Sequence, residues 1–316
     1  MELDINFKNK LDALLEGYKL ADLKEVSFSI IDQYQKEDKT HPVIDNELKA
    51  KIYAATRMPA TYKVAVDVLY EVFSIYHPYV ALSLDIGAGL GAATKALDDY
   101  YITNDLVLYE KEDAMINLAK KLYEDEDVGK RLQFRKFDAT KDEIEERDYG
   151  LVMSSYVLNE LKPEERKLVI NKMYDATRDL IIVIEPGTPY GYSIIKEVRD
   201  TLIKKGMNVI APCPHMGECP MKDHDWCHFS TRLQRSKLHK SLKEAEVPYE
   251  DEKYCYIALA KKGKGEPCNR ILRHPIIHKG LIKLTVCNSN GIEELEIRKK
   301  HPDFKVIKKL KVGEKF

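Results

Sequence analysis

The amino-acid sequence predicts an α/β fold built on a mostly parallel sheet, and three features lead to this prediction. From Ala81 onward, short apolar runs alternate with helical stretches. A glycine-rich turn follows the first run, and a cysteine-rich segment interrupts the pattern near its end. Strands that alternate with helices form parallel sheets with helices on both faces, because each connecting helix lies against the sheet.

The first part of the chain is predicted to be helical. Apolar residues recur at helical spacing from about residue 8 to residue 75, as at Leu11, Leu14 and Leu15 and again around Val68 and Leu69. A spacing of three or four positions places such side chains on one face of a helix. We therefore expect an N-terminal helical cap over residues 1–75.

Five apolar runs have the length of buried strands. They are Leu82–Ile86, Leu106–Tyr109, Leu151–Ser154, Leu180–Ile184 and Tyr254–Ala260. The sheet-forming domain is expected to span residues 76–262. Its last two runs lie about seventy residues apart, more than a crossover connection needs. This segment holds a predicted helix at Ser193–Lys205, and we expect an inserted loop over residues 211–230.

A β extension is predicted at the end of the chain. The runs Leu281–Cys287 and Ile292–Ile297 flank the sequence Asn288-Ser289-Asn290-Gly291. An Asn-Gly turn between two such runs is typical of a β-hairpin. The last domain is therefore expected to be a basic β extension over residues 263–316.

Charge is distributed unevenly along the 316 residues, although the formal net charge is only −1. Residues 1–189 carry 25 basic and 36 acidic side chains, whereas residues 261–316 carry 15 basic and 6 acidic ones. A basic terminal segment favours an anionic partner such as RNA, and a solvated basic face is the structural alternative.

The sequence predicts a cytosolic protein. The first residues contain no basic region followed by an apolar one, and no apolar run reaches the roughly 20 residues that span a bilayer. We therefore expect no membrane association. In a reducing compartment, clustered cysteines indicate a metal site in preference to disulfides.

The glycine-rich turn has the composition of a nucleotide-binding loop. Glycines at 87, 89 and 91 let the backbone turn sharply and approach a ligand closely. Asp85 precedes the turn, and Glu110 ends the next strand, where a carboxylate can accept both hydroxyl groups of a ribose. We predict that Asp85, Gly87, Gly89, Gly91 and Glu110 bind a cofactor.

Two further segments are expected at the same edge of the sheet. Asp138 falls where a third strand ends, and Ser155 and Tyr156 fall where the fourth ends. The carboxyl ends of parallel strands meet at one edge, where ligands bind. We therefore place Asp138 near an adenine amino group, and Ser155 and Tyr156 in the cofactor pocket.

These glycines and acidic residues, in this order, resemble those of the class I S-adenosylmethionine-dependent methyltransferases. The resemblance covers about residues 76–262 and implies a Rossmann-like sheet with S-adenosylmethionine as cofactor. A nicotinamide-dependent dehydrogenase is the competing hypothesis. The loop lacks the final glycine at the spacing of the dinucleotide fingerprint, which favours the methyltransferase.

The cysteine-rich segment indicates a metal centre. Cys213, Cys219 and Cys227 follow the spacing Cys-x5-Cys-x7-Cys, which differs from the paired knuckles of a zinc ribbon. Three thiolates with a distant fourth suit an iron–sulfur cluster. A zinc ion held by the three cysteines and one of the nearby histidines is the alternative. Those histidines are His215, His224 and His228.

Three cysteines are candidates for the fourth ligand. Cys255 lies inside an apolar strand and has the pattern of a small core residue, while Cys268 lies in a basic, flexible stretch. Cys287 ends a predicted strand directly before a turn, where a ligand would be held rigidly. We expect Cys287 to be the fourth ligand.

Five segments together resemble the methyltransferase-like proteins of the mitochondrial ribosomal small subunit and their prokaryotic relatives. They are Arg57-Met58-Pro59-Ala60-Thr61-Tyr62, Asp85-Ile86-Gly87-Ala88-Gly89, Val157-Leu158-Asn159-Glu160-Leu161, Glu185-Pro186-Gly187-Thr188-Pro189, and Cys213-Pro214-His215 through Cys219-Pro220 to Asp225-Trp226-Cys227-His228-Phe229. The resemblance implies a four-iron cluster on Cys213, Cys219, Cys227 and Cys287. It also implies S-adenosylmethionine binding and association with the small ribosomal subunit during assembly or translation.

Three functions are compatible with this pattern. The first is methylation of small-subunit ribosomal RNA, and the second is a non-catalytic ribosome-assembly scaffold that retains the cofactor pocket. The third is a zinc-stabilised methyltransferase for a small molecule or a protein. The basic C-terminal segment favours the two RNA functions. A DNA partner is not expected, and no catalytic residue is assigned, because methyl transfer depends mainly on alignment of the acceptor.

Overall fold

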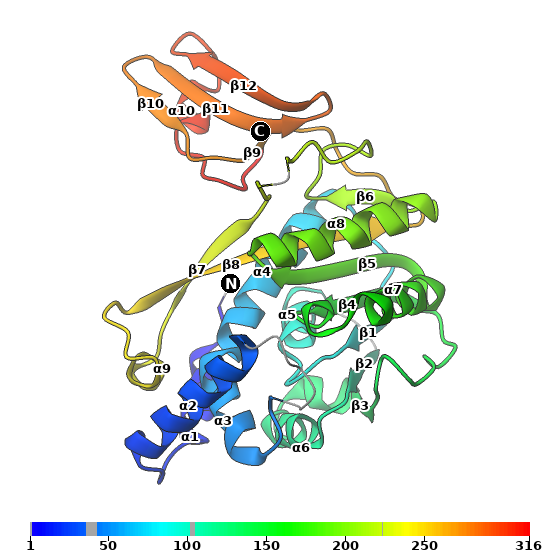
Figure 1. Cartoon of the computed structure of the whole chain (residues 1–316), viewed down its shortest axis with the longest axis vertical. Helices are drawn as coiled ribbons and strands as arrows, with labels where there is room; N and C mark the ends of the chain where they lie inside the picture. The colour runs from blue at the N-terminus through cyan, green and yellow to red at the C-terminus, as the bar shows by residue number, and fades with distance from the viewer. Residues whose placement is uncertain (1, 36–42, 102–104, 223) are drawn as a thin grey trace.

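The computed structural model describes residues 2–35, 43–101, 105–222 and 224–316 of the chain. Its centre is an eight-stranded sheet in the order β3-β2-β1-β4-β5-β8-β6, with β7 paired to the first part of β8 (Figure 1). The strands are β1 (Leu82–Ile86), β2 (Asp105–Glu110), β3 (Leu132–Lys136), β4 (Tyr149–Ser155), β5 (Thr177–Pro186), β6 (Asn208–Ala211), β7 (Phe229–Gln234) and β8 (Tyr249–Ala260).

Strands β1 to β5 run parallel, and β6, β7 and β8 join the sheet antiparallel. Strands β1, β2, β4 and β5 are mostly apolar and buried, as helical coverage of both faces requires, whereas β3 at the edge is partly exposed. This is the strand order of the class I methyltransferase fold, so the predicted fold class is confirmed. The sequence-based prediction missed β6 and β7, which flank the inserted loop.

Helices cover both faces of the sheet, and alternate residues of each strand face different cores. In β5, Ile182 packs into one core, while Ile181 and Val183 pack into the other. One face is covered by α4 (Met58–Ile75), α5 (Ala92–Tyr100) and α6 (Asp113–Leu122). The other is covered by α7 (Pro163–Ala176) and α8 (Pro189–Lys204), the latter close to the predicted helix.

The N-terminal region is helical, as predicted. It contains α1 (Ile5–Ala13), α2 (Leu20–Gln35) and α3 (Glu47–Thr56) before α4. Helix α4 is apolar on most sides, with Val64, Val68 and Val72 fully buried. It packs against α5 and also contacts β6, β7 and β8, so it forms part of the layer that covers the sheet. No helix of the described residues is long and apolar enough to cross a membrane.

Short elements complete the main body. They are the 3-10 helices η1 (Asp127–Arg131) and η2 (Leu158–Glu160) and the helix α9 (Lys237–Leu242), which joins β7 to β8. The cysteine-rich residues lie between β6 and β7, at the place where the sequence predicted an insertion.

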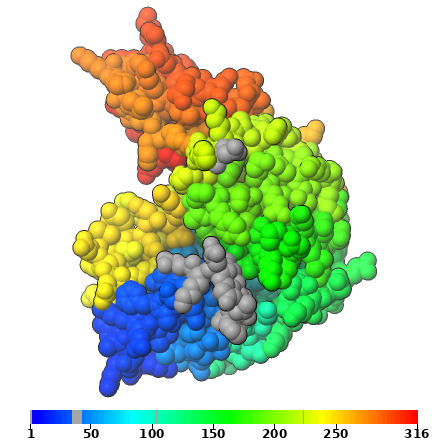
Figure 2. Space-filling model, viewed as in Figure 1, coloured from blue at the N-terminus to red at the C-terminus, as the bar shows by residue number. Residues whose placement is uncertain are grey.

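A second sheet follows the main body. Its strands β9 (Arg270–Ile271), β10 (Ile276–His278), β11 (Leu281–Asn288) and β12 (Gly291–Arg298) are antiparallel, and α10 (Phe304–Ile307) packs against them. Strands β11 and β12 form the predicted hairpin, whose turn places Gly291 at a φ of 110°. Figure 2 shows this sheet, in orange and red, as a lobe that projects from the body. The structure therefore extends the predicted hairpin to four strands.

Candidate functional site

The glycine-rich turn leaves the carboxyl end of β1 with a backbone that only glycine adopts easily. Gly87, Gly89 and Gly91 have φ values of 68°, 56° and 74°, and Gly91 caps the N-terminus of α5. A Cβ atom on Gly87 would lie 2.3 Å from Cγ2 of Val157, in the loop after β4. The turn therefore combines a left-handed backbone with close packing against the neighbouring strand's loop.

Glu110 is held at the end of β2 by three backbone N–H groups. Its Oε2 accepts a hydrogen bond from Gly89 (2.7 Å), and its Oε1 accepts from Lys111 (2.7 Å) and Glu112 (2.8 Å). The side chain is buried, and burial raises its pKa despite these bonds. The carboxylate is thus fixed against the glycine-rich turn, and its role as a cofactor ligand remains a prediction.

Asp85 lies beneath the turn and is 2% exposed. Its Oδ2 accepts a hydrogen bond from the Thr94 hydroxyl (2.7 Å), and its Oδ1 has no partner among the described residues. Burial, reinforced by the negative charge of Glu110, raises the pKa of Asp85 to about 7. A buried carboxyl oxygen without a partner is costly unless a donor reaches it.

Ser155 and Tyr156 lie at the carboxyl end of β4, and the hydroxyl oxygen of each is buried without a described partner. Tyr156 has a φ of 60°, which is rare for a bulky residue and frequent at binding sites. The Arg57 guanidinium lies 6.0 Å from its ring centre. Glu252 of β8 fixes Arg57 through two hydrogen bonds of 2.9 and 3.1 Å.

Asp138 follows β3 and makes mainly local contacts. Its Oδ1 accepts hydrogen bonds from the Thr140 N–H (3.0 Å) and hydroxyl (2.6 Å), and Lys111 and Lys141 lie 3.3 and 3.4 Å from Oδ2. Partial burial opposes ionisation, but the Thr140 hydrogen bonds and Lys111 hold its pKa at about 2. These contacts are those of a turn-capping aspartate, so the adenine role remains a prediction.

The four predicted metal ligands line a single cavity of about 50 Å³. Cys213, Cys219 and Cys227 come from the loop between β6 and β7, and Cys287 comes from β11 of the second sheet. None of the four is in a disulfide. Cys255 of β8 also lines the cavity, but its thiol donates a hydrogen bond to the Cys227 carbonyl (3.1 Å). The fold therefore brings together residues that are up to 74 positions apart in the chain.

Polar groups surround these thiols. The Tyr192 hydroxyl lies 3.0 Å from Cys219 Sγ, and His215 Nε2 lies 3.6 Å from Cys287 Sγ. Burial, together with the neighbouring cysteines, raises the pKa of Cys287 to about 12. Among the described residues, no three His, Cys, Asp or Glu side chains are grouped closely enough to hold one metal ion. The four cysteines thus border one cavity.

Three buried charged residues at these sites were not predicted. Glu185, in the quoted Glu-Pro-Gly-Thr-Pro segment, ends β5 and accepts a hydrogen bond from the Leu158 N–H (2.9 Å). Burial raises its pKa to about 8. Arg199 and Arg270 line the cysteine cavity with side chains only 4% exposed. A lone arginine on a helix or strand gives no sequence signal of burial, because arginine is normally exposed.

The raised pKa of Asp85 predicts how stability depends on pH in the ligand-free protein. Folding favours the neutral acid, so this stabilisation is present below pH 4 and is lost as the pH rises toward 7. A shift of about three units corresponds to about 4 kcal/mol. We expect Asp85→Asn to reduce the fall in the free energy of unfolding between pH 4 and 7, measured by urea titration.

Asp138→Asn is the matched control, because the lowered pKa of Asp138 has the opposite effect. Its ionised form stabilises the fold above pH 4, and this contribution is lost as the pH falls toward 2. Its removal should leave the slope between pH 5 and 7 unchanged. An Asp85→Asn protein with the wild-type slope in that range would show that Asp85 ionises normally.

Comparisons with known proteins identify relatives of the chain. The chain is 25% identical over 238 residues to the human mitochondrial ribosome assembly protein METTL17, covering 69% of this chain and 50% of that protein. It is 24% identical over 202 residues to the mitochondrial Rsm22-cox11 tandem protein 2 of Schizosaccharomyces pombe, covering 45% of this chain and 25% of that protein. The chain thus spans half the length of the first relative and a quarter of the second.

Solved structures with a similar arrangement include a magnesium protoporphyrin IX methyltransferase from Synechocystis PCC 6803. That likeness has a TM-score of 0.42 and 12% identity, and it covers 77% of this chain and 97% of that one.

The family described as mitochondrial small ribosomal subunit Rsm22 matches residues 47–316. The match includes the glycine-rich turn, the inserted loop and the C-terminal sheet, and it confirms the resemblance found in the sequence. The chain belongs to the Rsm22 family of mitochondrial small ribosomal subunit proteins.

Proposed function

We propose that this chain is an S-adenosylmethionine-binding, iron–sulfur protein that methylates or binds small-subunit ribosomal RNA during ribosome assembly or translation. The observation that carries the proposal is the gathering of four cysteines from two distant segments around one cavity, in a chain of the Rsm22 family. Both named relatives are mitochondrial proteins, and one of them is a ribosome assembly protein. The cytosolic location expected for this chain differs from theirs and is part of the proposal.

The glycine-rich turn supports the cofactor assignment. Glu110 has three of its roughly four lone-pair positions occupied by backbone N–H groups, so its carboxylate is rigid and retains capacity for a ribose hydroxyl. Asp85 has one buried oxygen free to accept from a donor on the ligand. The turn glycines, Ser155 and Tyr156 would border the same pocket. S-adenosylmethionine supplies an electrophilic methyl group when bound, and alignment of an acceptor with it is the main requirement for transfer.

The ligand set of the cysteine cavity supports the cluster assignment. Four cysteines that are predicted ligands border one cavity. Four cysteine thiolates are the ligands of a four-iron cluster. A zinc ion on three cysteines and His215 is the alternative, since His215 lines the same cavity. His228 instead stacks on Trp226, with ring centres 5.5 Å apart.

A cluster at this position would join two parts of the chain. Three of its ligands would come from the main body and the fourth from the second sheet. Cys287 pairs with Ile292 across the β11–β12 hairpin, and both residues line the cavity. Metal binding of this kind contributes directly to folding, because the ligands are far apart in the unfolded chain. The cluster would therefore fix the second sheet to the methyltransferase-like domain.

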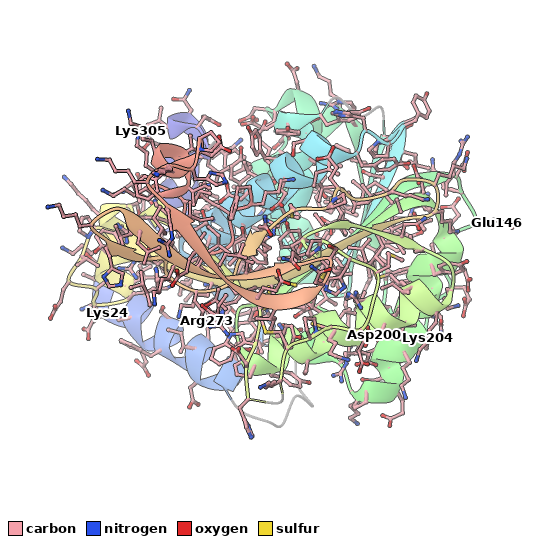
Figure 3. All side chains as sticks on the ribbon, turned by 90° about the horizontal axis from the view of Figure 1, so that it is seen from above. Lys24, Glu146, Asp200, Lys204, Arg273 and Lys305 are labelled. Atoms are coloured by element: carbon pink, nitrogen blue, oxygen red, sulfur yellow. The ribbon has the colours of Figure 1, made fainter. Side chains whose placement is uncertain are left out.

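The end of β12 and the segment that follows it, which contains α10, would supply the contact with RNA. From residue 298 to residue 311 the chain carries seven lysine and arginine residues and one acidic residue, Asp303. Lys305, Lys308 and Lys309 are exposed and form no ion pair with another described residue, and Figure 3 places Lys305 at the edge of the molecule in the view from above. Unpaired lysines neutralise phosphates and release counterions. Such contacts position RNA without reading its sequence.

The same arrangement fits a non-catalytic scaffold that keeps the cofactor pocket. Methyl transfer to ribosomal RNA from a deletion strain, but not to wild-type RNA, would distinguish the enzyme from the scaffold. A zinc-stabilised methyltransferase for a small molecule or a protein is the second alternative, and metal analysis separates it from the other two.

The cofactor assignment predicts that Glu110→Gln weakens S-adenosylmethionine binding at least tenfold. A buried hydrogen bond to a charged group contributes about 1.5–3 kcal/mol, and 1.4 kcal/mol is a factor of ten. Isothermal titration calorimetry measures the affinity, and the melting temperature checks folding. Glu112→Gln, two residues away, is the control and should bind like the wild type. If the Glu110→Gln protein binds S-adenosylmethionine as tightly as the wild type, Glu110 does not contribute to cofactor binding.

The metal assignment predicts that Cys213→Ser and Cys287→Ser lose the brown colour, iron and sulfide of anaerobically purified protein. About four iron and four sulfide per chain are expected in the wild type. Cys268→Ser, outside the cavity, and Cys255→Ser, whose thiol bonds a carbonyl, should keep them. One zinc and no sulfide in the wild type would favour the zinc alternative.

The RNA assignment predicts that the triple variant Lys305→Gln, Lys308→Gln and Lys309→Gln binds small-subunit ribosomal RNA about tenfold more weakly. The slope of the logarithm of its affinity against the logarithm of the salt concentration should become less steep by about 2. Each phosphate contact contributes about 0.7–0.9 to this slope. Filter binding at several salt concentrations measures both quantities. The control replaces three exposed lysines of the main body that form no ion pair with another described residue, Lys120, Lys167 and Lys204. If the two triple variants lose affinity equally, the contact is not in the segment that contains α10.

A further inference from the structure

Two buried arginines flank the cavity that the cysteines line. Arg199 comes from α8 and Arg270 from β9, and each side chain is 4% exposed. A buried guanidinium is costly unless negative charge or hydrogen-bond acceptors surround it. Their presence beside four cysteines therefore requires an explanation in terms of charge.

Arg199 holds the loop that carries the first two cysteines. Its Nη2 donates hydrogen bonds to the carbonyls of His215 (3.2 Å) and Gly217 (2.6 Å), which lie between Cys213 and Cys219. Its Nε is buried and has no partner among the described residues. One donor of a fully buried arginine is therefore available at the cavity.

Arg270 holds the other side of the cavity. Its Nε donates to the Pro212 carbonyl (3.2 Å), directly before Cys213, and its Nη1 donates to the Gly313 carbonyl (2.7 Å). Its third nitrogen pairs with Glu71 of α4. In the register of the second sheet, Arg270 lies opposite Cys287. It is thus adjacent to ligands from both segments.

Among the described residues, three cations line the cavity, Lys196, Arg199 and Arg270, and two carboxylates pair with them. Asp200, which is 32% exposed, is shared by Arg199 at 3.0 Å and Lys196 at 2.7 Å, whereas Glu71 pairs with Arg270. These five groups therefore carry a net positive charge when the thiols are neutral. Four thiolates on a four-iron core of charge about +2 would carry a net charge of about −2.

We propose that Arg199 and Arg270 are positioning residues that balance the charge of the cysteine-ligated cluster and raise its reduction potential. This inference rests on the proposed function. One-electron reduction adds a negative charge to the cluster, and a nearby positive charge in a medium of low dielectric constant stabilises that product. The free Nε–H of Arg199 would donate to a thiolate or sulfide sulfur, which acts in the same direction.

The test is the reduction potential of the full chain, measured by mediated spectroelectrochemistry after anaerobic purification. Arg199→Gln should shift the reduction equilibrium at least tenfold toward the oxidised cluster, which is 59 mV for one electron. Arg199→Lys keeps the charge and should restore most of the shift. Lys204→Gln is the matched control: it removes one charge from the same helix, but Lys204 is exposed and does not line the cavity. Water screens that charge, so a shift of less than twofold is expected.

Each outcome has one meaning. Zinc without sulfide in the wild type removes the cluster itself, and with it the proposed function. Four irons with equal potentials in all three variants keep the cluster but overturn the role of Arg199. Iron lost from both Arg199→Gln and Arg199→Lys also overturns it, because the carbonyl contacts and not the charge would then be required. Iron lost from Arg199→Gln alone supports the charge role. In that case the reduction potentials of Arg270→Gln and Arg270→Lys are measured and compared instead.

Discussion

The position of the second sheet depends on the side chain of Arg270, which is buried where three segments of the chain meet. It pairs with Glu71 on α4, donates to the Pro212 carbonyl at the start of the cysteine loop, and donates to the Gly313 carbonyl near the end of the chain. A guanidinium group has five donors in a fixed plane, so one residue can orient several backbones at once. Burial makes each of these contacts necessary, because a buried cation without partners would destabilise the fold.

The cofactor-type site and the cysteine cavity share two structural elements. Helix α4 begins beside Arg57, which lies over Tyr156 at the end of β4, and it carries Glu71 about four turns later. Strand β8 supplies Glu252, which fixes Arg57, and Tyr256, which donates to Glu71. Both sites are therefore built on α4 and β8, although they use different loops.

The glycine-rich turn and the cysteine loop reflect different physical constraints. Gly87 is required locally, because its backbone is left-handed and Val157 leaves no room for a side chain. The cysteine loop has little regular structure between β6 and β7, and its shape depends on distant groups such as Arg199, Arg270 and Cys287. A constraint of the first kind appears in a short sequence motif. The cysteines of the loop also form a motif, but the distant contacts that shape the loop do not appear in the sequence.

The sequence by itself determined the parallel strands, the hairpin at Asn288–Gly291 and the Rsm22-type motifs, because hydrophobic periodicity, turn chemistry and ligand spacing are local properties. It did not reveal β7, which follows the cysteine loop directly. In this strand, three buried residues alternate with three exposed ones. Nor could it indicate that the Asp138 carboxylate accepts hydrogen bonds from Thr140 and forms ion pairs with two lysines. Only the tertiary structure decided which cysteines line one cavity, that two arginines are buried beside them, and that Asp85 and Glu185 are fully enclosed. These features depend on contacts between residues far apart in the chain, and the charge of a side chain does not show whether the fold will bury it.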